Sequence, residues 1–207
     1  MKLDVQPSRY IDWRNLVALG CLIVALPGCA ADDPAPAGPT APRGRPPAVA
    51  PVRPAGTGTS TDAAIHHTAI QRVDRLDSST APGTGGGNYA CAWAVNKITK
   101  EATGYEVGGG LSTADMYDRL AAGRGTNTAV NAAPEGSVII SPTEWIGGVR
   151  KTGHVGILGT GSGSGRLIYS NSSGATNWKQ NFTAGRWANY YSGRGLKVKA
   201  YQIHEKP

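Results

Sequence analysis

The sequence predicts one α+β domain over roughly residues 85–207, preceded by segments of very different composition. Seven of the eight tyrosines and four of the five tryptophans lie after residue 84, and aromatic side chains dominate protein cores. Eight of the fourteen prolines lie between Pro34 and Pro54, outside that region. Within the last part of the chain, segments of helical periodicity occur beside segments rich in β-branched residues.

The N-terminus carries an apolar run at residues 16–26, which is too short to span a bilayer and has the length of a signal-peptide core. The run ends in Leu-Pro-Gly-Cys, which resembles the lipobox of bacterial lipoproteins. We therefore expect residues 1–28 to be removed and Cys29 to be lipidated. Because Ala30 follows, the resemblance implies sorting to the outer membrane, facing the periplasm. An uncleaved anchor and ordinary secretion are the alternatives.

Residues 29–84 are rich in Pro, Ala and Gly, and such a segment buries too little apolar surface to fold. We expect a largely disordered tether. Its few apolar residues after position 55 form either a short helix docked on the domain or no structure; they are Ile65, Ile70, Val73 and Leu76.

The chain has a formal net charge of +7, and only 17% of its residues are charged. The basic residues are scattered singly, which excludes a dedicated nucleic-acid groove. A mildly basic exterior suits a polyanionic partner such as an acidic cell wall, although charge alone fits simple solubility equally well.

Cys91 is the cysteine that remains once the signal is removed and Cys29 is lipidated, and a lone thiol in an exported chain is either inert or reactive. The small and apolar residues at 89–98 recur at helical spacing, which places Cys91 in the first turn of a helix. Helix N-termini stabilise a thiolate, and their N–H groups can hold an oxyanion. The pattern favours a reactive thiol.

A β-hairpin is predicted from residues 153–158 and 166–171, which flank a glycine-rich loop. It carries His154, which alternation places on the face opposite Val155. We interpret His154 as the general base that takes the Cys91 proton. The other histidines are expected to be solvated; they are His66, His67 and His204.

The position of the loop centre decides which residue orients His154. If the centre lies between Ser162 and Gly163, Asn171 lies directly opposite His154 and shares its face. If the centre lies at Ser162 itself, Ser170 faces His154 and Asn171 points away. We favour Asn171.

Other elements follow from capping residues and alternation. Ser112 caps a helix predicted for 113–122, and Thr183 caps one that runs through Tyr191. Residues 137–140 and 196–203 are predicted strands.

Four features resemble, in their order and spacing, those of the papain-like bacterial cell-wall hydrolases. They are the early cysteine on a helix, the Pro-x-Gly turn before an Ile-rich strand, the Gly-His-Val-Gly-Ile strand and the polar residue on the next strand. CHAP amidases and NlpC/P60 endopeptidases are the nearest families, and the likeness covers residues 83–203. It implies a small antiparallel sheet with the cysteine helix packed against the histidine strand. It also implies Cys91 as nucleophile, His154 as base and Asn171 as third polar residue.

Tyr89 matches a tyrosine common in NlpC/P60 proteins, whereas Ala90 replaces the Asp or Gln that these families carry before the cysteine. The side-chain oxyanion donor is therefore unassigned between Asn88 and the Tyr89 hydroxyl. Trp145 is a candidate for the rim of the substrate site.

The resemblance implies a monomeric enzyme that cleaves an amide bond of the peptidoglycan stem peptide, as an amidase or an endopeptidase. The lipid anchor would hold it at the membrane. No cofactor or metal is expected, because one Cys and one His are too few ligands for a structural zinc. The alternative is a non-catalytic peptidoglycan-binding or structural lipoprotein on the same scaffold.

Overall fold

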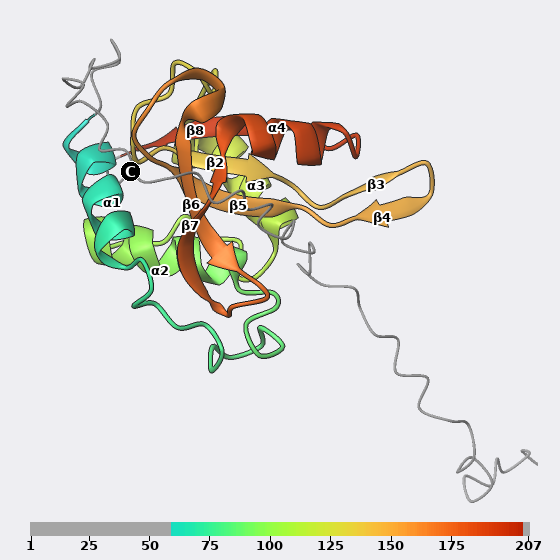
Figure 1. Ribbon diagram of the computed structural model, residues 1–207, viewed down its shortest axis with the longest axis horizontal. Coiled ribbons are helices and arrows are strands. Elements are labelled where there is room, and N and C mark those ends of the chain that lie inside the picture. Colours follow the sequence, from blue (N-terminus) through green and yellow to red (C-terminus); the bar gives the residue numbers. More distant parts are fainter. Residues whose placement is uncertain (1–58, 205–207) are drawn as a thin grey trace, which may run out of the picture.

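The computed structural model describes residues 59–204 and confirms an α+β fold built on a six-stranded antiparallel sheet (Figure 1). The strand order is β1-β8-β2-β5-β6-β7. Its strands are β1 (Gly125–Thr128), β2 (Val138–Ser141), β5 (His154–Leu158), β6 (Leu167–Ser172), β7 (Asn177–Thr183) and β8 (Lys199–Ile203). The predicted signal at 1–28, the lipidation site Cys29 and most of the predicted tether lie outside the described residues.

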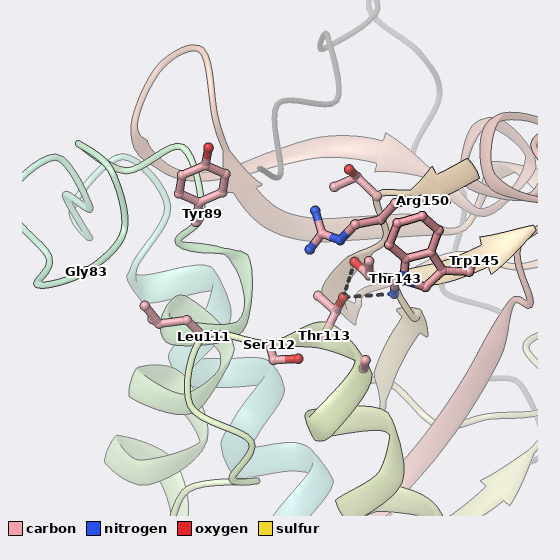
Figure 2. Close-up of a pocket in the computed structure, with 10 residues that line it drawn as sticks. Gly83, Tyr89, Leu111, Ser112, Thr113, Thr143, Trp145 and Arg150 are labelled. Atoms are coloured by element: carbon pink, nitrogen blue, oxygen red, sulfur yellow. Dashed lines mark hydrogen bonds between the residues drawn. The ribbon is translucent and has the colours of Figure 1, made fainter. Parts of the chain in front are cut away.

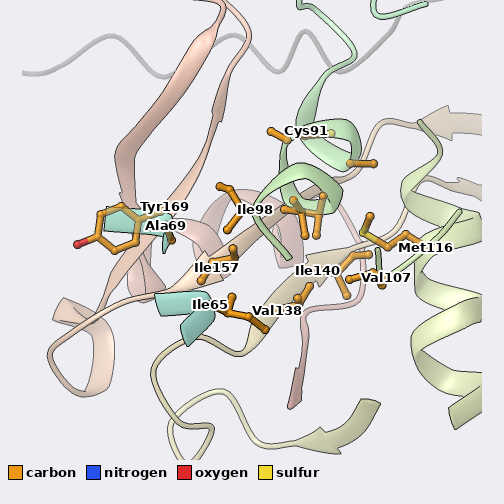
Figure 3. Close-up of a cluster of buried hydrophobic side chains, with 14 of the residues drawn as sticks. Ile65, Ala69, Cys91, Ile98, Val107, Met116, Val138, Ile140, Ile157 and Tyr169 are labelled. Carbon is orange, nitrogen blue, oxygen red and sulfur yellow. The ribbon is translucent and has the colours of Figure 1, made fainter. Parts of the chain in front are cut away.

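Helices cover both faces of this sheet. They are α1 (Ser60–Gln71), α2 (Cys91–Thr103), α3 (Thr113–Arg119) and α4 (Ala184–Ser192), with short turns of other helical type at Leu120–Arg124 and Gly163–Gly165. The helices α1 and α2 pack on the face that carries Val155 and Ile157, which we call the α2 face (Figure 3). Helix α4 packs on the face that carries Ile139 and Leu158, which we call the α4 face.

Helix α2 begins at Cys91, as the sequence predicts, and packs against β5 and β6. The stripe of Cys91, Val95 and Ile98 is fully buried against the sheet. The helix ends at Gly104, whose φ of 88° is a left-handed conformation that glycine adopts at little cost. The packing of the cysteine helix on the histidine strand therefore agrees with the expected arrangement.

The predicted capping residues also act as expected. The Ser112 side chain accepts a hydrogen bond from the Asp115 N–H at the start of α3. The Thr183 side chain accepts one from the Arg186 N–H at the start of α4. Each bond satisfies one backbone donor that a helix start leaves open.

The folded body begins earlier than the predicted boundary at residue 85. Thr59 and Asp62 form a capping box at the start of α1, and Ile65 and Ala69 are fully buried in the core. The Trp178 indole N–H donates to the Ala69 carbonyl at 2.9 Å. Ile65 and Ile70 thus lie in the docked helix that the sequence left open, while Val73 and Leu76 follow it and pack against the core, so the described end of the tether is part of the domain.

A second, two-stranded sheet forms a hairpin that projects from the body (Figure 1). Its strands are β3 (Glu144–Ile146) and β4 (Val149–Lys151), joined by Gly147 and Gly148 with φ of 58° and 77°. Two consecutive residues of positive φ suit a tight hairpin turn, which explains the glycine pair. None of the described helices is both long and apolar enough to cross a membrane.

Candidate functional site

Cys91 occupies the position that the sequence predicts, at the first residue of α2. The residue before it, Ala90, has no side chain that can cap the helix. The Cys91 side chain is only 1% exposed and belongs to the apolar cluster on the α2 face. The sulfur therefore lies beneath packed side chains, and a substrate carbonyl reaches it only if the structure opens locally.

His154 is the first residue of β5 and lies at its α4 face. Its Nε2 lies 3.0 Å from Ser170 Oγ, and the Ser170 hydroxyl donates to Asn181 Oδ1 at 2.7 Å. With the Asn181 amide oriented so that its Oδ1 accepts from Ser170, the single hydroxyl hydrogen of Ser170 is used, so Ser170 Oγ accepts from His154 and Nε2 carries a proton. This chain of hydrogen bonds fixes the tautomer in which Nδ1 is the basic nitrogen.

Aromatic rings enclose the imidazole under α4. The His154 ring centroid lies 5.3 Å from that of Trp187 with an interplanar angle of 29°, and 6.1 Å from that of Tyr191. Phe182 closes a third side at 6.0 Å, and His154 is 3% exposed. The Trp187 indole N–H donates to Ser141 Oγ, which ties α4 to the strand beside His154. The imidazole is therefore buried and packed in the same way as a core side chain.

The register of β5 and β6 differs from the predicted one, and Ser170 rather than Asn171 bonds to His154. Gly156 pairs with Ser170, one position away from the predicted register, and a shift of one residue moves a side chain to the other face. The observed register is neither of the two considered from the sequence: Ser170 lies opposite Gly156 and reaches His154 diagonally on the α4 face, while Asn171 lies on the α2 face. There its Nδ2 donates to the Gly87 carbonyl at 3.2 Å, which fastens the segment before α2 to β6.

The two predicted reactive residues lie on different faces of the sheet. Cys91 belongs to the cluster on the α2 face, whereas His154 is packed among rings of the α4 face. The structure therefore brings Cys91 and Asn171 to one face and His154 and Ser170 to the other.

Asn171 Oδ1 is one of several buried polar atoms in residues 59–204 that lack a hydrogen bond. The whole Asn171 residue is 1% exposed. Buried polar atoms are paired in the large majority of cases, and an unpaired one costs about 1–3 kcal/mol. The Asn171 oxygen is therefore an unsatisfied acceptor on the face that carries the thiol, and Asp62 and Ser78 carry comparable unpaired atoms elsewhere in the domain.

A pocket of about 540 Å³ opens beside the start of α2 (Figure 2). Tyr89, from the segment before α2, lies on one side, and Trp145 and Arg150 of the β3–β4 hairpin lie on the other. Apart from Leu111, the remaining lining residues are small or polar; they are Gly83, Ser112, Thr113, Ala114, Thr143 and Thr152. This volume lies within the range of ordinary ligand sites.

Hydrogen bonds connect the pocket wall to the strand of His154. Thr113 Oγ1 lies 3.0 Å from Thr143 Oγ1 and accepts from the Thr143 N–H at 3.1 Å. Thr143 Oγ1 in turn accepts from the N–H of Gly153, the residue before His154, at 2.9 Å. A ligand in the pocket therefore contacts residues bonded to the start of β5.

The weaker candidates are divided. Tyr89 and Trp145 line the pocket, and the Trp145 side chain is 72% exposed. Asn88 is exposed, and its Nδ2 donates to the Gly85 carbonyl at 3.0 Å, so its amide stays within its own loop. The described residues contain no group of three His, Cys, Asp or Glu side chains that could hold a metal ion.

Sequence reasoning missed Arg150 and the relay through Asn181. Arg150 could have been found from the sequence, because Gly147-Gly148 between alternating residues is typical of a hairpin turn, and such a hairpin pairs Trp145 with Arg150. Asn181 lies at a β-bulge between β6 and β7, and no local pattern marks that bulge.

Comparisons with protein-family models, curated proteins and solved structures found no match to this chain. The fold defines the class of the protein as an α+β domain with a six-stranded antiparallel sheet covered by helices on both faces.

Proposed function

We propose that this chain is a cysteine hydrolase that cleaves an amide bond in the peptidoglycan stem peptide, with Cys91 as nucleophile. The observation that carries the proposal is the buried, unpaired Oδ1 of Asn171 on the same face as the Cys91 side chain. An imidazole placed between these two groups would donate Nε2–H to Asn171 and accept the thiol proton at Nδ1. The papain-like resemblance gives the same three residues these roles.

The proposal requires a second position of the His154 side chain. His154 is the first residue of β5 and follows Gly153, so its ring lies at the end of the strand. Moving from the α4 face to the α2 face would exchange the Ser170 hydrogen bond for one to Asn171 and give up the stacking on Trp187. The move also gives up the contacts with Tyr191 and Phe182 and needs a backbone rotation at Gly153–His154, because the Cβ of a strand residue is fixed to one face, so the second position is a minor population.

In that position the reaction proceeds by two acyl transfers. Nδ1 of His154 takes the Cys91 proton while the sulfur forms a bond to the amide carbonyl carbon. The C–N bond breaks as the imidazolium returns that proton to the leaving amine. Water then hydrolyses the thioester, which releases the carboxylate and restores the thiol.

A second candidate is a peptidoglycan-binding module without turnover on the same scaffold. The observation that favours it is the burial of both residues, because Cys91 is 1% exposed in the apolar cluster and His154 is 3% exposed among aromatic rings. On this proposal the pocket beside Tyr89 binds the wall, and both residues serve only the core.

Purified muropeptides distinguish the two candidates. A hydrolase converts them to fragments that have gained one water, and the fragment masses show whether the cut lies in the stem peptide or at its junction with the sugar. Cys91→Ala should abolish the products without unfolding the chain. Intact muropeptides after long incubation with reduced protein that still binds them would leave only the binding module.

Thiol labelling gives an independent measurement in a chain with Cys21→Ser and Cys29→Ser. A hydrolase predicts rapid alkylation of Cys91 near neutral pH, slowed in His154→Ala when both chains are compared below their unfolding temperatures. Equal and slow alkylation in both would show an inert core thiol.

We further propose that the mature chain is anchored in the outer membrane through lipid on Cys29 and faces the periplasm. The support is the lipobox-like sequence alone. Metabolic labelling with radioactive palmitate should mark the wild-type chain and not Cys29→Ser; equal labelling would overturn the assignment.

A further inference from the structure

We propose that the pocket between Tyr89 and the β3–β4 hairpin binds a carboxylate of an acidic stem peptide, with Arg150 pairing the carboxylate and Trp145 covering the neighbouring part of the peptide. The inference rests on the proposed function and names the recognition element of the same site. It assigns the projecting hairpin a role in substrate specificity.

The hairpin presents the two side chains together. Trp145 and Arg150 are directly paired across β3 and β4, so both project from one face of the hairpin, with Cβ atoms roughly 5 Å apart. Both line the pocket, and Tyr89 lies across from them (Figure 2). A ligand between the hairpin and Tyr89 would meet a guanidinium and two aromatic rings.

Exposure of Trp145 has no structural explanation. Its side chain is 72% exposed, whereas Trp178 and Trp187 are fully buried. Trp145 is placed to contribute to ligand affinity, because tryptophan is enriched among the residues that carry most of a binding energy.

The charge of the pocket selects an anion. Among the described residues that line it, Arg150 is the only charged one. A guanidinium matches a carboxylate through two parallel hydrogen bonds, and such charge-assisted bonds are stronger than neutral ones. Stem peptides carry free carboxylates, and the formal net charge of +7 adds a favourable long-range field.

The hairpin is also fastened at its base. Lys197 Nζ lies 2.6 Å from Glu144 Oε1, and the glycine turn fixes the pairing of the two strands. Thr143, immediately before β3, bonds both to Thr113 and to the N–H of Gly153. The ligand would therefore lie between the segment that leads to Cys91 and the segment that leads to His154.

The test uses the Cys91→Ala chain, which cannot turn over substrate, and a disaccharide-tripeptide muropeptide as the probe. Binding is measured by calorimetry with this probe and with the same molecule after its carboxylates are amidated. Arg150→Gln should weaken binding of the acidic probe roughly tenfold or more, because a charge-assisted pair is lost. Amidation should weaken binding similarly, and Arg150→Gln should then add little, since the two changes remove one interaction.

Arg75→Gln is the matched control, because Arg75 is exposed and does not line the pocket. It removes the same charge and should leave both affinities within about twofold. Trp145→Ala should weaken the acidic and the amidated probe by equal factors. Equal losses for Arg150→Gln and Arg75→Gln, or an Arg150→Gln effect that persists with the amidated probe, would overturn the inference.

The outcomes separate this inference from the proposed function. Cleavage by the wild type with no dependence of binding on Arg150 would overturn the carboxylate site and leave the hydrolase standing. Arg150-dependent binding without cleavage would support the carboxylate site and reject the hydrolase. Absence of both binding and cleavage would reject the two together.

Discussion

Replacement of His154 by alanine tests where the imidazole lies. In this structure the ring is 3% exposed, bonds to Ser170 and stacks on Trp187 and Tyr191. Loss of two ring contacts costs about 1–3 kcal/mol together, and loss of the hydrogen bond costs about 0.5–1.5 kcal/mol. We expect His154→Ala to lower the free energy of unfolding by about 3 kcal/mol, which is roughly 6–12 °C in Tm for a domain of this size.

Urea unfolding followed by tryptophan fluorescence measures this loss directly, because Trp187 is in contact with the ring. Lys179→Ala, which removes a partly exposed side chain of β7, serves as control and should cost less than about 0.5 kcal/mol. A loss below 1 kcal/mol for His154→Ala would show that the imidazole is not packed under α4. The stability of the variant must also be known before any loss of its activity is assigned to catalysis.

Three further predictions concern other parts of the fold. Ser170→Ala removes a hydrogen bond, worth about 1 kcal/mol, that holds the imidazole on the α4 face. A hydrolase should therefore gain up to about fivefold in kcat on muropeptides. A lower kcat in this variant would show that Ser170 orients the reacting ring. Burial lowers the pKa of His66, so below about pH 6.5 the folded chain binds fewer protons than the unfolded one. The free energy of unfolding should therefore fall as the pH drops below that value. Urea titrations at several pH values measure this slope, and the His66 contribution to it should be absent in His66→Gln. Gly136→Ala should cost more than about 3 kcal/mol, because the added Cβ would lie 1.9 Å from the Asp62 carbonyl oxygen at a φ of 91°, and a nearly unchanged Tm would contradict that contact.

The helices were predictable because their signals are local. Ser112 and Thr183 cap the helices that follow them, and Cys91 begins the helix in which it was expected. Strand β7 was not predictable, because its buried residues change faces. At the bulge, Ile168 pairs with Phe182 and Tyr169 with Gln180, so Trp178 packs on the α2 face while Phe182 packs on the α4 face. A two-residue alternation is lost when a bulge inserts one residue.

The site depended on a register that the glycine-rich loop does not encode. The turn at Gly163–Gly165 places Ser170 opposite Gly156. An error of one residue in the register, which is half a residue in the loop centre, assigns the wrong face to every residue of β6. For this reason the cysteine helix and the histidine strand were predicted together correctly, whereas the partner of His154 was not.

Strand β6 presents a hydrogen-bond acceptor on each face of the sheet, and either acceptor could bind the imidazole of His154. Ser170 is in use on the α4 face, and the adjacent Asn171 presents an unpaired buried oxygen on the α2 face. In a hydrolase the two residues compete for the ring, so removal of Ser170 and removal of Asn171 should change kcat in opposite directions. In a binding module neither residue meets the ligand, and each substitution should alter only stability. The sign of the kinetic response, rather than the size of any single loss, therefore decides whether Cys91 and His154 act as a pair.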